Sequence, residues 1–214
     1  MPAFRLSRRR LVLGITGAAF AVAATERALA AALTPSETEG PFFPRDTNVE
    51  RDADLTRLAN RTARAAGQVI EFDGRVLDAQ GKPIAGARIE LWQANAAGRY
   101  AHPGDAGNKA PLEPNFQGYA LLTSGKDGTF RLTTIKPAGY NVPAIGVRTP
   151  HLHWKIEAGA RKLTTQSYFP NEPQNDTDAL MRRMGAPARD LIARAAKANE
   201  PGALAFAWDV VLPA

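Results

Sequence analysis

The chain has 214 residues, 44% of them hydrophobic, a formal net charge of +6 and no cysteine. The absence of cysteine excludes zinc–thiolate and iron–sulfur sites and a cysteine nucleophile. The charge is concentrated at one end, because residues 1–30 hold five arginines and one glutamate, which leaves +2 for the remaining 184 residues. This balance gives little support to nucleic-acid binding, and the remaining length suits one domain with a hydrophobic core.

Residues 1–30 have the pattern of an export signal. An arginine-rich head precedes an apolar stretch from Leu11 to Ala24, and Ala28 to Ala30 offer a small-residue cleavage site. The segment Ser7 to Leu13 resembles a twin-arginine signal. A membrane anchor is disfavoured, because about 14 apolar residues are fewer than the roughly 20 that span a bilayer. We expect export by the twin-arginine route to the periplasm or the exterior, with no stable membrane span after cleavage.

The next segment, residues 31–66, combines turn-forming and charged residues with little periodicity. We interpret it as an N-terminal arm that ends in a short helical stretch from Asp54 to Ala66. Residues 67–214 then form the folded domain.

From Val69 onward the chain reads as short strands separated by turns. Apolar and polar residues alternate over 69–76, 87–91 and 129–133, with turn signals between them. The last strand shows the clearest period of two, which places five apolar residues on one face: Leu204, Phe206, Trp208, Val210 and Leu212. This pattern predicts a mainly β fold, a β-sandwich.

Before the last strand, residues 176–199 have helical composition. Gly185 and Pro187 interrupt this segment. We therefore expect two short helical pieces there.

Two of the three histidines form the triplet His151-Leu152-His153. On a strand, side chains at i and i+2 point to the same side, so both imidazoles are expected to converge on one site. Alone this signal is weak, since two histidines at this spacing are more often a surface pair. No acidic residue lies between Arg148 and Lys155, so a carboxylate ligand of the kind that zinc and ferrous sites usually have must come from elsewhere.

The four tyrosines are the other candidate ligands. They are Tyr100, Tyr119, Tyr140 and Tyr168. For any single tyrosine, packing in the core with the hydroxyl at its edge is the better interpretation.

Several ordered motifs together are more specific. They lie at Trp92–Tyr100, Asn115–Gly118, Thr134–Tyr140, Arg148–His153 and Leu163–Phe169, and a further one in the arm at Thr34–Phe42. These segments resemble the intradiol ring-cleavage dioxygenases, nearest the protocatechuate 3,4-dioxygenase branch. The likeness runs from about residue 34 to the C-terminus, without the long helical N-terminal dimerisation domain of the catechol 1,2-dioxygenases.

The resemblance implies a non-haem Fe(III) site. Position by position, its four ligands correspond to Tyr100, Tyr140, His151 and His153. Arg148 corresponds to the active-site arginine and Gln166 to the glutamine near the substrate. Tyr119, Tyr168 and His102 correspond to no ligand and are assigned to structural roles.

The resemblance also implies a reaction, in which O2 cleaves a catechol to a cis,cis-muconate-type diacid. Two phenolates favour Fe(III) over Fe(II), and with two imidazoles and one hydroxide the site carries no net charge. Tyr140 leaves the metal and accepts a catechol proton, while Arg148 stabilises the carbanion-like ring. The expected partners are therefore a catechol-type molecule and O2, and we expect a homo-oligomer.

One departure from the branch concerns the substrate. The second tyrosine is normally followed by Pro and Trp, whereas here Tyr140 is followed by Asn141-Val142-Pro143, and the link to Arg148 is a couple of residues short. A shorter aromatic wall predicts room for a larger or differently substituted catechol.

Two other classes stay open. The segment Gly74 to Ala87 resembles a hairpin of transthyretin-like domains, which predicts an exported binding module without turnover. The paired tyrosines and histidines argue against it, because such a module has no need of them. A hydrolase ranks third, since no serine lies in a nucleophile elbow.

Overall fold

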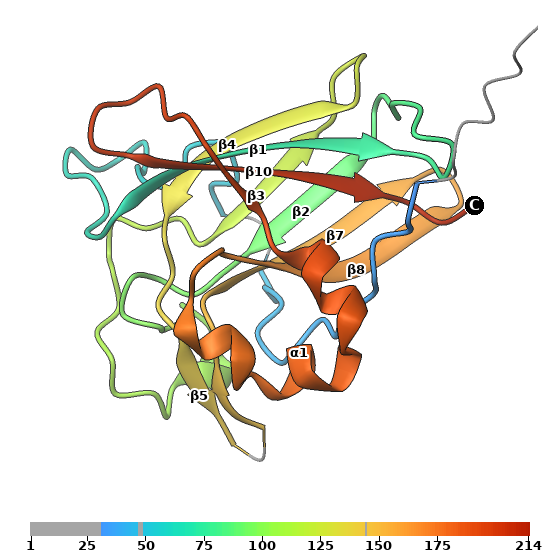
Figure 1. The fold of residues 1–214 in the computed structure, drawn as a ribbon. Coiled ribbons are helices and arrows are strands. Elements are labelled where there is room, and N and C mark those ends of the chain that lie inside the picture. Colours follow the sequence, from blue (N-terminus) through green and yellow to red (C-terminus); the bar gives the residue numbers. More distant parts are fainter. Residues whose placement is uncertain (1–30, 47–48, 144) are drawn as a thin grey trace, which may run out of the picture.

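The computed structural model describes residues 31–46, 49–143 and 145–214 (Figure 1). The export signal predicted for residues 1–30 lies outside them. No helix within these described ranges is long and apolar enough to cross a membrane.

Two four-stranded sheets form the domain, as the alternating pattern predicts. The first has the order β4-β1-β10-β9, with β1 (Val69–Leu77), β4 (Thr129–Ile135), β9 (Arg194–Ala196) and β10 (Leu204–Val211). The second has the order β3-β2-β7-β8, with β2 (Arg88–Trp92), β3 (Tyr119–Thr123), β7 (His151–Ala158) and β8 (Arg161–Tyr168). A separate hairpin consists of β5 (Tyr140–Val142) and β6 (Gly146–Arg148). The mainly β prediction is confirmed.

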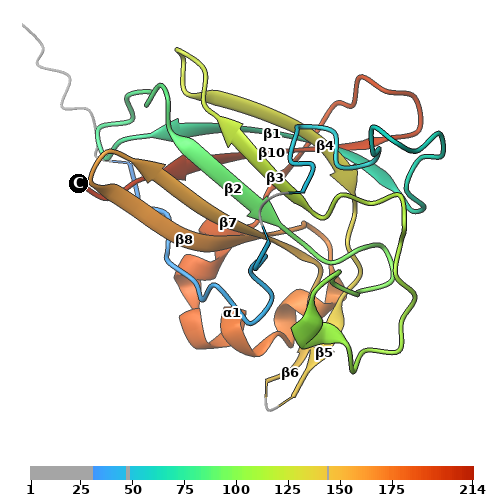
Figure 2. The ribbon, with the colours of Figure 1, turned by 180° about the vertical axis from the view of Figure 1, so that it is seen from behind.

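The two sheets form two layers (Figure 2), and an aromatic core lies between them. Trp154 of β7 is fully buried, and its ring lies 5.3 Å from that of Phe72 on β1 and 5.8 Å from that of Trp208 on β10. Phe206 and Val210 share the buried side of β10, but Leu204, predicted to lie with them, is 44% exposed. The last strand therefore follows its predicted period except at its first residue, where the sheet ends.

The segment predicted to be helical before β10 forms mainly short helical turns. They are η2 (Pro173–Asp176), α1 (Ala179–Met184) and η3 (Ala186–Leu191), while η1 (Pro103–Asp105) lies in an earlier loop. The predicted pieces on either side of Gly185 are thus present but short, and the segment ends as strand β9 rather than helix. Figure 1 shows these turns and the β5–β6 hairpin at one end of the sandwich, where α1 contacts β6.

The predicted helix from Asp54 to Ala66 is wrong. The Asp52 carboxylate accepts a hydrogen bond from the Asp54 amide at 2.8 Å, and the Asp54 carboxylate accepts one from the Thr56 amide at 3.0 Å. Such local side-chain bonds compete with helix formation. Leu55 is fully buried and its amide bonds to β4, so the segment is tied to the sandwich as irregular chain.

Strand β7 places the histidines on the side of the sheet away from the core. Leu152, Trp154 and Ile156 belong to the core, so His151 and His153 point the opposite way. They are nevertheless only 2% exposed. Part of their cover is the arm, whose Glu37 amide bonds to the carbonyl of Thr164 on β8.

Candidate metal centre

The four predicted ligands meet on the outer side of β7. The hydroxyls of Tyr100 and Tyr140 lie 3.1 Å apart, and the Tyr140 hydroxyl lies 3.0 Å from Nε2 of His151. Nε2 of His151 lies 3.1 Å from Nε2 of His153. Three different parts of the chain thus bring four atoms with lone pairs together in a buried site. The convergence of the two imidazoles predicted from the sequence is confirmed.

Strand register explains much of this arrangement. Across β2, β7 and β8, Trp92, His153 and Gln166 lie in one row, and the Trp92 and His153 rings are stacked at 5.0 Å. In the next row His151 lies opposite Tyr168. Pairing alone therefore places His153 beside the predicted glutamine and His151 beside Tyr168.

The tyrosines come from outside this sheet. Tyr100 lies in the loop after β2, where its amide bonds to the Asp105 carboxylate at 2.8 Å. Tyr140 begins β5, and its register partner on β6 is Arg148. Their ring centroids lie 5.3 Å apart in an edge-to-face arrangement, and the two hydroxyls are neighbours.

Both histidines are held neutral. Nδ1 of His151 donates to the Thr149 carbonyl at 2.6 Å, which leaves the lone pair on Nε2. Burial lowers the pKa of His151 to about 3, and burial followed by the neighbouring His151 lowers the pKa of His153 well below its usual value. Neutral imidazole is the form that binds metals.

Burial has the opposite effect on the phenols. It raises the pKa of Tyr140 to about 12 and, together with the neighbouring Tyr140, raises the pKa of Tyr100 well above its ordinary value. Phenolates therefore require a nearby cation stronger than Arg148, and a multivalent metal ion is one.

The donor set fits a metal ion of this kind. Neighbouring ligands of one ion lie roughly 3 Å apart when their bonds to it are about 2 Å long. Among the described residues no group of three or more His, Cys, Asp or Glu side chains is placed to hold a metal ion, so this site, with its two phenols, differs from carboxylate or thiolate centres. Two hard phenolic oxygens instead favour a trivalent ion such as Fe(III).

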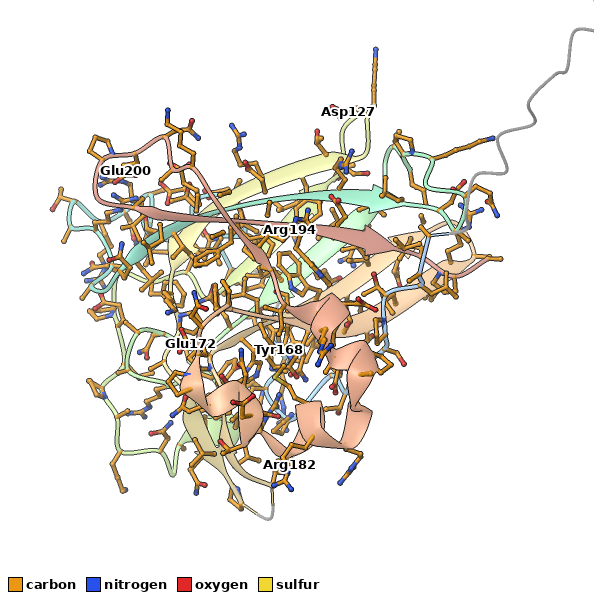
Figure 3. The ribbon with its side chains drawn as sticks, in the orientation of Figure 1. Asp127, Tyr168, Glu172, Arg182, Arg194 and Glu200 are labelled. Atoms are coloured by element: carbon orange, nitrogen blue, oxygen red, sulfur yellow. The ribbon has the colours of Figure 1, made fainter. Side chains whose placement is uncertain are left out.

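Arg148 lies beside the ligands and is 3% exposed. Its Nε donates to the Asp178 carboxylate at 2.8 Å, and its Nη2 donates to Oε1 of Gln166 at 2.6 Å and to the Tyr168 hydroxyl at 3.2 Å. Tyr168, labelled near the centre of the view in Figure 3, is 1% exposed. The structure thus brings together Arg148 and Gln166, the two residues that the resemblance assigned to the site.

Tyr168 and Asp178 are the residues that sequence analysis missed. Tyr168 was assigned to packing, yet its hydroxyl accepts from Arg148 and donates to Gln166 at 3.2 Å. Spacing held a clue, since Gln166 and Tyr168 are two apart on one strand and share a face. No local pattern marks Asp178.

The arm covers the site. The Gln166 amide donates to the carbonyl of Thr38 at 3.0 Å, and the Phe42 ring lies 4.7 Å from that of Tyr100. Gly40 has a φ of 73°, and a Cβ there would lie 3.2 Å from the His153 ring. Glycine therefore suits this close approach.

A groove of about 560 Å³ leads from the surface to Tyr140. Its walls include Phe42, Asn108, Asn141 and Pro143. Among the described residues that line it none is Lys or Arg, and the one acid is Asp105. Tyr140 is the one proposed ligand among these lining residues, so the described lining offers no cation beside Tyr140 for a substrate carboxylate.

Comparison with known proteins agrees with this geometry. The family model described as Dioxygenase matches residues 38–214. The chain is 39% identical over 169 residues to the protocatechuate 3,4-dioxygenase beta chain of Burkholderia cepacia, which covers 75% of this chain and 71% of that one. It is 29% identical over 180 residues to the hydroxyquinol 1,2-dioxygenase of a Rhizobium strain, covering 78% of this chain but only 58% of the relative.

Solved structures give the same picture. The dioxygenase domain of a dioxygenase–carbohydrate-binding fusion from Streptomyces sp. SirexAA-E superposes with a TM-score of 0.64 at 31% identity, covering 85% of this chain and 99% of that one. The 3-chlorocatechol 1,2-dioxygenase of Rhodococcus opacus 1CP gives 0.66 at 26% identity, covering 84% and 72%.

Proposed function

Since the chain belongs to the intradiol ring-cleavage dioxygenases, nearest the protocatechuate 3,4-dioxygenase branch, we propose that it cleaves a catechol between its two hydroxyl-bearing carbons with O2. Tyr100, Tyr140, His151 and His153 are the proposed ligands of a non-haem Fe(III), and the product is a cis,cis-muconate-type diacid. The convergence of these four side chains carries the proposal. From Tyr100 through Tyr140 and His151 to His153, each hydroxyl or Nε2 atom lies 3.0–3.1 Å from the next.

Bound iron would supply Lewis acidity, which keeps both phenols ionised and draws electron density from a coordinated catechol. The Tyr140 phenolate accepts one catechol proton at its phenolic oxygen. The guanidinium of Arg148 stabilises negative charge that develops on the ring. Gln166 holds the guanidinium, and Phe42 with the arm keeps water from the site.

The transthyretin-like binding module is not favoured. A module without turnover gives no reason to bury two phenols and two imidazoles in contact beside an arginine. The matched family and its relatives are enzymes of the dioxygenase type. A homo-oligomeric state remains part of our proposal.

The direct test is colour and turnover of the purified protein. Phenolate-to-Fe(III) charge transfer predicts a reddish, iron-containing protein that consumes O2 with catechol, and chelation should abolish both colour and turnover. Because no Lys or Arg lines the groove, plain and alkyl catechols should compete well with protocatechuate in kcat/KM. A colourless, iron-free and inactive protein favours the binding module, and a large preference for protocatechuate contradicts the substrate assignment alone.

We also propose export by the twin-arginine route. That route carries folded proteins, which suits a metal site assembled before transport. Replacing Arg8 and Arg9 by Lys is expected to trap the precursor in the cytoplasm, as cell fractionation and immunoblotting would show. Normal export of this double variant would exclude the route.

A further inference from the structure

Asp178 is a fully buried carboxylate at the N-terminus of α1. Its Oδ1 accepts from the amides of Leu180 at 2.9 Å and Met181 at 3.2 Å, which caps the helix. Its Oδ2 accepts from Arg148 Nε at 2.8 Å and from the Thr149 amide at 3.0 Å. One side chain thus joins the helix, the guanidinium and the segment that leads into His151.

The rest of the guanidinium is held asymmetrically. Nη2 is engaged by Gln166 and Tyr168, whereas Nη1 forms no hydrogen bond with any residue in the described ranges. Asp178, Gln166 and Tyr168 therefore hold Nε and Nη2 and leave Nη1 for a ligand of the site. A planar guanidinium held at two nitrogens has little freedom to rotate.

We propose that Asp178 is a positioning residue for the ring-cleavage reaction, which holds the Arg148 guanidinium so that Nη1 faces the bound ring. This inference rests on the proposed function. Asp178 touches neither substrate nor ligand atoms in our assignment and acts through Arg148 alone. Without its charge, Arg148 is free to turn toward Glu37 of the arm, whose pKa burial raises while the Thr38 amide and then Arg148 lower it in part.

Asp178→Asn separates positioning from capping. Asparagine is as good an N-cap as aspartate, so the bonds to Leu180 and Met181 persist. The negative charge of the Asp178 carboxylate is lost, and an NH2 group at the Oδ2 position would face the Nε–H of Arg148. We expect kcat to fall about ten- to hundredfold, the scale of a misplaced catalytic group, with KM changed by less than about threefold.

Two readouts distinguish positioning from a structural role. Iron content and the visible band of the resting protein are expected to stay as in the wild type. The Nε–H resonance of Arg148, protected from exchange by Asp178 in the wild type, should exchange faster in the variant. Asp209→Asn is the matched control, because it breaks the ion pairs with Arg75 and Arg194 on the far sheet and should leave kcat unchanged.

A double-mutant cycle guards against a variant that folds poorly. In an Arg148→Met background, Asp178→Asn should cost no further activity, since there is no guanidinium left to position. Independent losses of similar size, or loss of iron and colour in Asp178→Asn, would overturn the proposal. So would an unchanged kcat in the folded single variant. An inactive wild type is a different result, because it contradicts the proposed function itself.

Discussion

Tyr140→Phe is expected to leave a coloured, iron-containing protein that turns over catechol at least about a hundredfold more slowly than the wild type. The change removes one hydroxyl, which lies 3.1 Å from that of Tyr100 and 3.0 Å from Nε2 of His151. Three of the four proposed ligands remain, so iron should still bind, with an altered visible band. Catechol should also bind, but the group that accepts its proton is gone.

The large effect follows from the surroundings of Tyr140. Burial raises the pKa of this phenol to about 12, so its phenolate, once separated from a cation, is a strong base. No other described residue within contact of the Tyr140 hydroxyl has this property except Tyr100, which remains a ligand. Stopped-flow absorbance would separate catechol binding, expected to persist, from the slow turnover.

Tyr119→Phe is the matched control. Tyr119 is 2% exposed and packs in the same aromatic cluster, but its hydroxyl has no hydrogen-bond partner among the described residues. Its loss should therefore change neither colour nor rate. Should this control lose iron while Tyr140→Phe keeps both iron and full activity, the ligand assignment has failed.

The histidine pair shows what the sequence can predict. Its convergence depends only on strand periodicity, and β7 realises it with two Nε2 atoms 3.1 Å apart. The tyrosines are different, because Tyr100 lies in the loop after β2 and Tyr140 in the β5–β6 hairpin. Their meeting with β7 depends on pairing across the fold, so no local period marks them and only the family resemblance assigned them.

The failures have physical causes of the same kind. The segment Asp54–Ala66 has turns fixed by aspartate side chains, which outweigh its helical composition. Asp178 looks like an ordinary helix cap, and only packing of α1 against β6 brings it to Arg148. The spacing rule used for the histidines also places Tyr168 on the same face as Gln166. Only that rule could have indicated a role for Tyr168 in the site rather than in core packing.

Arg148→Met is expected to keep iron and colour while kcat falls on the order of a hundred- to thousandfold, as for loss of one preorganised electrostatic group. Methionine fills much of the same volume, so packing changes little. Stability should fall too, because Asp178, fully buried, loses its cation. A broken buried pair costs roughly 3–5 kcal/mol. Because three backbone amides still donate to Asp178, we expect the loss of stability to lie near the lower end of that range.

The Arg148→Met/Asp178→Asn double variant separates these two effects. It removes the unpaired charge and keeps the helix cap, so thermal unfolding should recover much of the lost stability while turnover stays at the level of Arg148→Met. Arg131→Met, which breaks an exposed ion pair with Asp73, is the control and should leave both nearly unchanged. If turnover recovered together with stability, Arg148 would serve the fold and not the ring, and charge stabilisation in this site would need another source.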